Sequence, residues 1–352
     1  MSAPNTAETA ETAATPETAV MADVVDAPSD RRRRRKLLLL LLLVLLFGLL
    51  LIVAVWYLLF RQPLPTIPIL PAAELPKYAT SIYGVERPAG VAVLSDGSRI
   101  YVADSGAARD VVMFDAGGKQ LGTLTPPAET GSAHTPVYVA IDPINQDVYV
   151  TDRMTGTIYI YNRDGAYQRE FTSSTDIKGW QPLGLAFDAQ GLLYVTDLSG
   201  IAAQVLVFDR QGAQVRAIGA DQKMSFPNGV VVDKNGLVYV TDSNNGRLLV
   251  FDATGSVVAQ IGRGSDSGKL GLPRGIAIDS KDRLFIADNT GQYVQIYRVR
   301  QGTSSRLDYV GVFGDVGIGD GQFSYPSAVA VDNRGFVYVT DSGNSRVQIW
   351  SY

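Results

Sequence analysis

Apolar residues follow two different patterns along this chain, and the patterns divide it into two parts. Residues 37–60 form one continuous apolar run that contains no charged side chain. From about residue 78 onward, the apolar residues come instead in short runs that are separated by turn residues such as Asp, Asn and Gly. A long continuous run is typical of a membrane-spanning helix, whereas short bounded runs are typical of β-strands.

The long apolar run is sufficient to cross a bilayer. At about 1.5 Å per residue, a helix over residues 37–60 extends roughly 36 Å, which exceeds the ~30 Å hydrocarbon core. Basic residues occupy every position of 31–36, whereas Arg61 alone follows the run closely. This asymmetry predicts a cytoplasmic N-terminus and an extracytoplasmic C-terminal part. A cleaved signal peptide is the alternative, but its apolar core is shorter and precedes a small-residue cleavage site.

The segments on either side of the apolar run have biased compositions. Residues 1–36 are rich in Ala, Thr, Glu and Pro before the basic run, which predicts a disordered cytoplasmic tail. Residues 61–77 contain five prolines, which predict an extended stalk. The remaining residues, 78–352, are then expected to form one domain held outside the cytoplasmic membrane.

Within residues 78–352 one unit recurs six times. Each unit has a proline, an apolar strand, a polar turn, and a second apolar strand that ends in Asp. The prolines are Pro88, Pro136, Pro182, Pro227, Pro273 and Pro326, and the aspartates are Asp104, Asp152, Asp197, Asp242, Asp288 and Asp341. Successive aspartates lie 45 to 53 residues apart. A period near 45 residues that is built from short strands predicts one propeller blade per unit.

The strands of a unit and the ends of the domain predict a closed ring. In the fourth unit the strands are expected at 229–233, 237–241, 247–251 and 257–262. The last unit stops after its third strand, and residues 78–84 resemble a fourth strand without a unit of its own. This segment is expected to complete the sixth blade, which removes the free sheet edges. The predicted fold is an all-β, six-bladed propeller with four-stranded antiparallel blades.

Composition and charge exclude several classes of protein. The chain has no Cys and one His, so disulfides, thiolate nucleophiles and Cys-bound metals are excluded. The formal net charge is −4, which argues against a nucleic-acid partner. No enzyme signature of the nucleophile-elbow, zinc-protease or phosphate-loop type is present.

The units resemble NHL repeats, whose pattern is roughly Pro-x-Gly-[IV]-Ala-[VI]-Asp-x-x-Gly-x-[IV]-Tyr-Val-x-Asp-[ST]-x-Asn-x-Arg. Residues 226–251 and 325–350 match this pattern nearly throughout, whereas the first three units lack the Asn-x-Arg element. The resemblance implies a six-bladed propeller but not one function, because relatives include binding domains, receptor sensor domains and a peptide-amidating lyase. The layout of tail, helix, stalk and propeller is similar to that of bacterial membrane-anchored propellers.

The aspartates that recur in every unit suggest a ring of metal ligands, with calcium as the ion that carboxylates favour. A residue present in every unit is better interpreted as structural: its carboxylate caps backbone N–H groups of a turn. Arg247 and Arg346 belong to the repeat pattern and are assigned to bonds between strands. We therefore predict no metal and no cofactor, and calcium has no support beyond the carboxylates.

The loops that lead from one unit into the next are long and differ among units, as expected of a binding surface on a rigid scaffold. They share a face with the turns that follow the recurring aspartates. Residues after three of the prolines are polar and are expected at the central channel, and Trp and Arg are enriched in interaction hot spots. The candidate binding residues are Asn228, Arg274, Ser327, Arg153, Lys178, Trp180, Lys223, Tyr325 and His134.

These patterns predict a membrane-anchored, extracytoplasmic binding or scaffold module. Its expected partner is an envelope protein, a peptide or a glycan, with the membrane engaged through one helix and no nucleic acid bound. The alternative is a metal-dependent lyase or lactonase-type enzyme with its site at the mouth of the propeller. The single His and the scarcity of Glu in the propeller argue against that enzyme.

Overall fold

The computed structural model describes residues 28–60, 75–127, 133–199, 202–300 and 306–352. The chain separates into two compact units, Met1–Leu70 and Pro71–Tyr352, and each is described by itself. Within the described residues, the first unit is the helix α1 (Pro28–Phe60). The second unit contains all of the β-strands.

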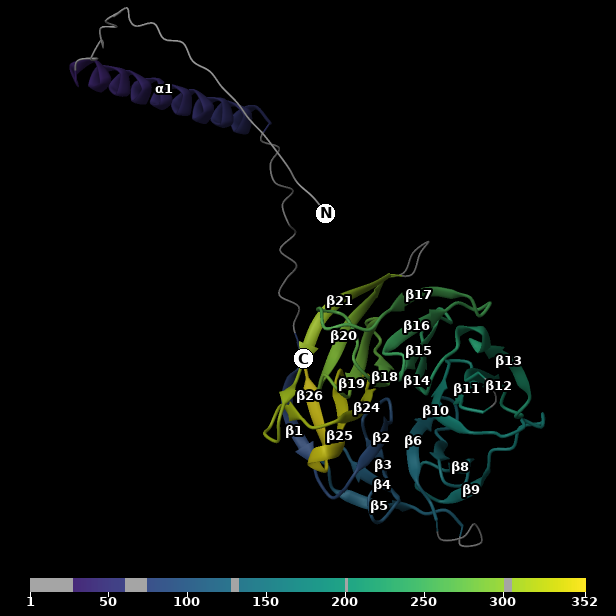
Figure 1. The fold of residues 1–352 in the computed structure, drawn as a ribbon. Coiled ribbons are helices and arrows are strands. Elements are labelled where there is room, and N and C mark those ends of the chain that lie inside the picture. The colour runs from purple at the N-terminus through teal and green to yellow at the C-terminus, as the bar shows by residue number, and fades with distance from the viewer. Residues whose placement is uncertain (1–27, 61–74, 128–132, 200–201, 301–305) are drawn as a thin grey trace, which may run out of the picture. The chain divides into compact units, whose positions relative to one another are not determined.

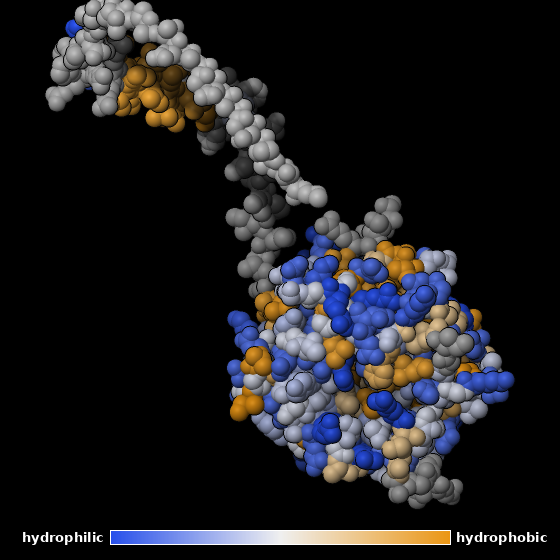
Figure 2. Space-filling model, viewed as in Figure 1, coloured by the Kyte–Doolittle hydropathy of each residue, from blue (hydrophilic) through white to orange (hydrophobic). Residues whose placement is uncertain are grey.

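One helix among the described residues, over Lys36–Trp56, is long and apolar enough to cross a membrane, a test that a signal sequence also passes. None of this window is buried, and Figure 2 shows its hydrophobic surface in orange. The helix begins at Pro28, whereas the tail was expected to extend through residue 36. Arg and Lys are good helix formers and extend a helix that the Leu run nucleates. Residues 1–27 of the predicted tail and 61–74 of the predicted stalk lie outside the described residues.

The second unit is an all-β propeller of six four-stranded antiparallel blades, as predicted (Figure 1). Blades 1 to 3 are β2 (Pro88–Val93), β3 (Arg99–Asp104), β4 (Val111–Asp115) and β5 (Gln120–Leu124); β6 (Pro136–Ile141), β7 (Val148–Asp152), β8 (Thr157–Tyr161) and β9 (Tyr167–Glu170); and β10 (Pro182–Phe187), β11 (Leu193–Asp197), β12 (Gln204–Phe208) and β13 (Gln214–Ile218). Blades 4 and 5 are β14 (Pro227–Val232), β15 (Val238–Asp242), β16 (Arg247–Phe251) and β17 (Val257–Ile261); and β18 (Pro273–Ile278), β19 (Arg283–Asp288), β20 (Tyr293–Arg300) and β21 (Arg306–Phe313). Blade 6 is β24 (Pro326–Val331), β25 (Val337–Asp341), β26 (Arg346–Ser351) and β1 (Lys77–Ile82).

The first described strand after α1 closes the ring. β1 pairs antiparallel with β26, with Lys77 opposite Ser351 and Ile82 opposite Val347, which confirms that this segment completes the sixth blade. Ser342 Oγ also donates a hydrogen bond to the Pro88 carbonyl at 2.5 Å, which joins blade 6 to blade 1. The two ends of the propeller sequence therefore share one sheet.

The hydrophobic core consists of layers between neighbouring blades. The layer between blades 1 and 2, for example, packs Tyr101 of β3 against Val139 of β6 and Tyr159 of β8. The innermost strands approach most closely at a glycine two residues after the proline. A Cβ on Gly184 would lie 2.2 Å from the Asn228 carbonyl oxygen of the next blade, so no side chain fits there.

The loop between blades 5 and 6 contains a small ribbon that the pattern does not predict. In it β22 (Asp315–Val316) pairs in parallel with β23 (Gln322–Phe323). Short 3-10 turns, η2 (Ala220–Gln222) and η3 (Ser342–Asn344), lie in other connections. Elements of two or three residues are too short to produce a detectable hydrophobic period.

Candidate functional site

The recurring aspartates hold each blade together. Asp242 of blade 4 is fully buried and accepts hydrogen bonds from the Ser225 backbone N–H at 2.7 Å, Asn245 Nδ2 at 2.8 Å and Arg247 Nε at 2.7 Å. Blade 6 repeats this arrangement around Asp341. The structural interpretation of the aspartates and of the repeat arginines is therefore confirmed.

His134, a candidate binding residue, belongs to the same kind of network in blade 2. Its Nδ1 lies 2.8 Å from Asp152 Oδ2, and its ring meets the Tyr159 ring edge-on, with 5.8 Å between centroids. The side chain is 12% exposed. His134 thus contacts Asp152 in the way that Arg247 contacts Asp242.

Within the parts of the chain that the structure describes, no group of three or more His, Asp or Glu side chains could hold a metal ion. The carboxylates of the recurring aspartates are directed at donors of their own blades, as the preceding contacts show.

The channel mouth is formed by the first residue after each blade's proline and by the turns beside it. In blades 4, 5 and 6 these first residues are polar: Asn228, Arg274 and Ser327. Asn228 and Ser327 are each 8% exposed, and Arg274 is half-buried. Ser327 Oγ lies 2.9 Å from Ser342 Oγ and donates to the Tyr325 carbonyl at 3.3 Å. The side chains of Asn228 and Arg274 have no hydrogen-bond or ion-pair partner among the described residues.

Arg274 is a partly buried cation that lies near a second cation, Arg153. Burial and, secondarily, the nearby Arg153 guanidinium lower the pKa of Arg274 below its usual value. No carboxylate in the described ranges forms an ion pair with it. The Arg274 guanidinium and that of the exposed Arg153 therefore lie near each other, and neither has an ion-pair partner among the described residues.

Arg153 occupies a position that other blades use to hold their neighbours. In blades 4, 5 and 6 the residue after the recurring aspartate is Ser243, Asn289 or Ser342, and each donates to the proline carbonyl of the next blade. Arg153 makes no such bond; its guanidinium carbon lies 5.4 Å from the centroid of the Phe226 ring. Phe226 directly precedes blade 4, so Arg153 reaches past blade 3 across the mouth.

Tyr138 crosses the channel below these residues. It stands in blade 2 where blades 1, 3, 4 and 5 have glycine, and its hydroxyl lies 2.8 Å from where a Cβ on Gly229 of blade 4 would be. The side chain is 9% exposed, and burial raises its pKa. Its hydroxyl has no hydrogen-bond partner among the described residues. Tyr138 is therefore a third unpartnered polar group at the mouth.

A cavity of about 350 Å³, whose lining residues are mostly apolar in type, lies along the channel beyond Tyr138. It is lined by the later residues of all six inner strands, such as Val91, Val139, Leu185 and Ile276. Ile276 also approaches the same Cβ position on Gly229 as the Tyr138 hydroxyl, which places the tyrosine at the inner end of the cavity. The polar side chains Asn228, Arg274 and Ser327 thus belong to the end of the channel where the inner strands begin, whereas mostly aliphatic residues line its other end.

The remaining candidate residues lie outside the channel mouth. Trp180 is half-buried and packs edge-on against Phe208, with 5.8 Å between centroids, so it belongs to the core between blades 2 and 3. Lys178, Lys223 and Tyr325 are exposed on the connecting loops of the mouth face. The structure thus brings together Asn228, Arg274, Ser327 and Arg153, and adds Tyr138 and Phe226, which were not among the predicted site residues. A departure from the repeat pattern, Tyr in place of Gly, was the available signal for Tyr138.

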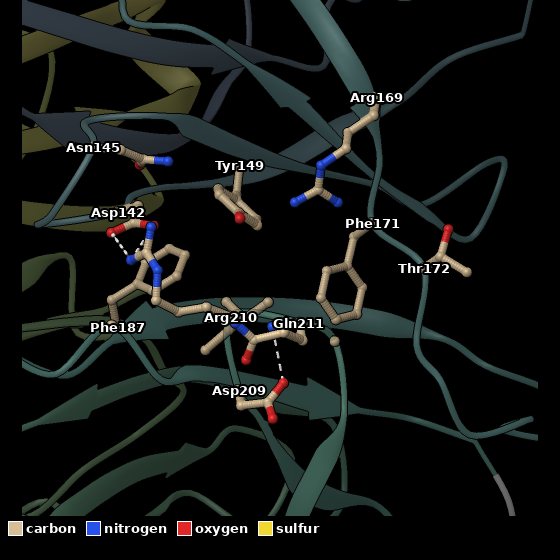
Figure 3. A pocket seen from close by; sticks show the side chains of 13 residues that line it. Asp142, Asn145, Tyr149, Arg169, Phe171, Thr172, Phe187, Asp209, Arg210 and Gln211 are labelled. Carbon is tan, nitrogen blue, oxygen red and sulfur yellow. Dashed lines mark hydrogen bonds and ion pairs between the residues drawn. The ribbon is translucent and has the colours of Figure 1, made fainter.

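A second hollow of about 150 Å³ lies between blades 2 and 3 (Figure 3). Tyr149 and Phe187 meet edge-on in its wall, with 4.9 Å between centroids. Arg210 pairs there with Asp142 at 2.9 Å, as the dashed lines in Figure 3 indicate. The buried carboxylate of this hollow, Asp142, is already paired with Arg210. The hollow therefore offers a ligand fewer unpartnered polar groups than the channel mouth does.

Comparison with known proteins supports the fold. The NHL repeat family model matches residues 224–251 and 323–350, which lie in blades 4 and 6. No curated protein matches the sequence significantly. Streptogramin B lyase has a similar structure at 13% identity and a TM-score of 0.55, covering 79% of this chain and 99% of that one. Virginiamycin B lyase from Staphylococcus aureus is similar at 13% identity and a TM-score of 0.53, covering 78% of this chain and 98% of that one. Kuenenia stuttgartiensis hydrazine synthase is similar at 15% identity and a TM-score of 0.56, with the same coverage of the two chains. At such identities the similarity shows the fold alone.

Proposed function

The chain is a six-bladed propeller with NHL repeats, and we propose that it is a binding module that engages its partner at the channel mouth. The observation that carries this proposal is the gathering of unpartnered polar side chains, Asn228, Arg274 and Tyr138, at one end of the channel. A few polar side chains that converge at the opening of a concave site are the usual means by which such a site orients a ligand.

The proposed setting is the outer side of the cytoplasmic membrane. The exposed apolar surface of α1 supports a membrane anchor, and the basic run at its start supports a cytoplasmic N-terminus. The partner is then an envelope protein, a peptide or a glycan. The lyase or lactonase alternative lacks support from the side chains, because the described residues bring no metal-ligand group to the mouth.

Site-specific photo-cross-linking in cells tests this function with a matched control. A photo-reactive phenylalanine analogue replaces Tyr325, which precedes blade 6 on the mouth face and is 58% exposed. The control position is Ile144, which is 56% exposed in the turn between β6 and β7 on the opposite face. We expect a discrete adduct from position 325 and none from position 144. Equal labelling from both, or labelling from 144 alone, would contradict the proposed face.

A further inference from the structure

We propose that the channel mouth binds an oxyanion group, a carboxylate or a phosphate, between Arg274 and Arg153. This inference rests on the proposed binding function and names the ligand chemistry of that site. It is carried by the charges, the neutral donors and the departures from the repeat pattern at the mouth.

Arg274 differs from the buried arginines elsewhere in the propeller. Arg346 pairs with Asp341 at 2.8 Å, and Arg283 pairs with Asp279 at 2.6 Å. Arg274 has no such partner among the described residues and is instead close enough to Arg153 for mutual repulsion to lower its pKa. An unpaired, partly buried cation is costly, so an anion between Arg274 and the exposed Arg153 stabilises Arg274.

Neutral donors complete the chemistry of the mouth. The residues Asn228 and Tyr138 are 8% and 9% exposed, and their side chains have no hydrogen-bond partner in the described part of the chain. Both groups can donate hydrogen bonds to an oxygen atom. A guanidinium fork matches the paired oxygens of carboxylates and phosphates, so the available donors all suit an oxyanion.

Blade 2 lacks structural bonds beside the mouth that other blades have. Arg153 replaces a residue type that bonds the next blade in blades 4 to 6, as described above. Thr151 Oγ1 is buried without a partner, whereas the equivalent Thr241 hydroxyl accepts the Gly229 N–H at 2.8 Å and donates to the Arg274 carbonyl at 2.5 Å. Blades 1 and 3, with Ser105 and Leu198 at this position, also lack the bond to the next blade, so in blade 2 the distinguishing features are the charged Arg153 and the unpartnered Thr151 hydroxyl.

The shape of the mouth limits the ligand. Tyr138 spans the channel from blade 2 to blade 4, so a group that enters from the mouth stops at its ring. The cavity lies on the other side of this tyrosine. The oxyanion is therefore small or sits at the end of a chain, such as an acidic side chain, a terminal carboxylate or a phosphate monoester.

Arginine footprinting tests the proposal at residue resolution. The full chain is held in micelles of an uncharged detergent and modified with phenylglyoxal, and adducts at each arginine are quantified by mass spectrometry. Acetate, methyl phosphate and chloride are compared at equal ionic strength. With a millimolar dissociation constant, ~10 mM of a binding oxyanion slows modification of Arg274 about tenfold. Arg87, which is exposed in blade 1's entry loop, reports any general effect of salt.

The two oxyanions distinguish the sources of the chemistry. Protection of Arg274 by acetate alone identifies a carboxylate, and protection by methyl phosphate alone identifies a phosphate; either supports the proposal. The proposal is overturned if, at up to ~50 mM, a concentration well above a millimolar dissociation constant, neither oxyanion protects Arg274 more than chloride does. It is also overturned if Arg87 is protected to the same extent as Arg274.

Arg153→Ser tests the second cation without disturbing the fold, because serine occupies the same position in blades 4 and 6. We expect it to raise the oxyanion concentration for half protection of Arg274 about tenfold, since a charge-assisted contact is lost. Lys178→Ser removes a charge from the same face away from the mouth and should change nothing. If both substitutions have equal effects, the anion responds to the overall charge of the face and the proposed site is wrong.

These outcomes separate this proposal from the binding function on which it rests. Protection of Arg274 without an adduct from position 325 supports the oxyanion site and contradicts the partner-binding function. An adduct from position 325 without protection of Arg274 does the reverse.

Discussion

At the scale of single residues, recurrence distinguishes structural side chains from candidate binding side chains. The aspartate at the end of each second strand recurs in all six units, and Asp242 shows why: a carboxylate there bonds the preceding loop and the following strand. The sequence alone predicted this role. It did not predict that His134 bonds Asp152, because the two are 18 positions apart and the contact depends on how the loop returns to the strand.

Removal of the Asp242 carboxylate tests this structural role. Asp242→Ala removes the buried carboxylate that accepts from Arg247 Nε and Asn245 Nδ2 and leaves each with a single backbone carbonyl acceptor, so we expect the free energy of unfolding to fall by about 3 kcal/mol. Asp266→Ala, in an exposed loop where its carboxylate has no hydrogen bond among the described residues, is the control and should change stability little. Denaturant unfolding of both variants measures the difference. Equal stabilities would show that the recurring aspartate is not a structural residue.

The His134 contact has a similar test at the residue scale. His134→Ala removes a partner of the buried Asp152, and we expect a loss of about 1 to 2 kcal/mol. His134→Gln retains an amide donor and should recover part of that loss. If the same unfolding experiment shows that His134→Ala leaves the stability unchanged, the contact with Asp152 is not stabilising, and the structural role of His134 is contradicted.

At the scale of elements, the strands are more predictable than the connections between them. The predicted strands of the fourth unit differ from β14 to β17 by only one or two residues at their ends. Alternating apolar residues and Asx-Gly turns fix these strands locally. The β22–β23 ribbon and the crossing of Tyr138 depend instead on tertiary contacts, so local sequence reasoning did not find them.

The close approach of the inner strands supplies a prediction at this scale. Gly184→Ala and Gly275→Ala each place a methyl group 2.2 to 2.4 Å from backbone atoms of the next blade, so the blades must separate. We expect each to destabilise the propeller by about 1 to 3 kcal/mol. Gly262→Ala, with no atom within 4 Å of its Cβ and no left-handed φ, is the matched control. If all three variants melt alike, the inner strands tolerate a wider spacing than the structure shows.

At the scale of the whole molecule, repeat arithmetic predicted the closure of the propeller. Six units with one missing fourth strand, and one spare strand before the first unit, allow a ring only if the ends pair. The pairing of β1 with β26 confirms this. The same reasoning could not locate the unpartnered charges, because their lack of partners appears only when all six blades are assembled.

A disulfide across the seam tests this closure in a chain that contains no other cysteine. Lys77 and Ser351 are opposite each other in the β1–β26 pair, and neighbouring antiparallel positions are spaced for a disulfide. We expect Lys77→Cys with Ser351→Cys to oxidise readily and to raise the melting temperature. Free thiols after mild oxidation would indicate that the ring is not closed at this seam.

The orientation in the membrane is also a prediction for the whole molecule. Protease added to intact cells with a permeable outer layer should digest the propeller and spare the N-terminal segment. The mass of the membrane-extracted chain should include residues 1–60, because we interpret α1 as an anchor. Protection of the propeller would reverse the topology, and loss of the N-terminal segment would indicate a cleaved signal sequence.

The most direct test of the account is the yield of the photo-cross-link from position 325 in full-length chains with and without Arg153→Ser. The account predicts a discrete partner adduct from the parent chain and a loss of most of that adduct when Arg153 is replaced, at unchanged membrane levels of the chain. Lys178→Ser should leave the yield unchanged. An adduct of undiminished yield from the Arg153→Ser chain would contradict partner binding through the charges of the channel mouth.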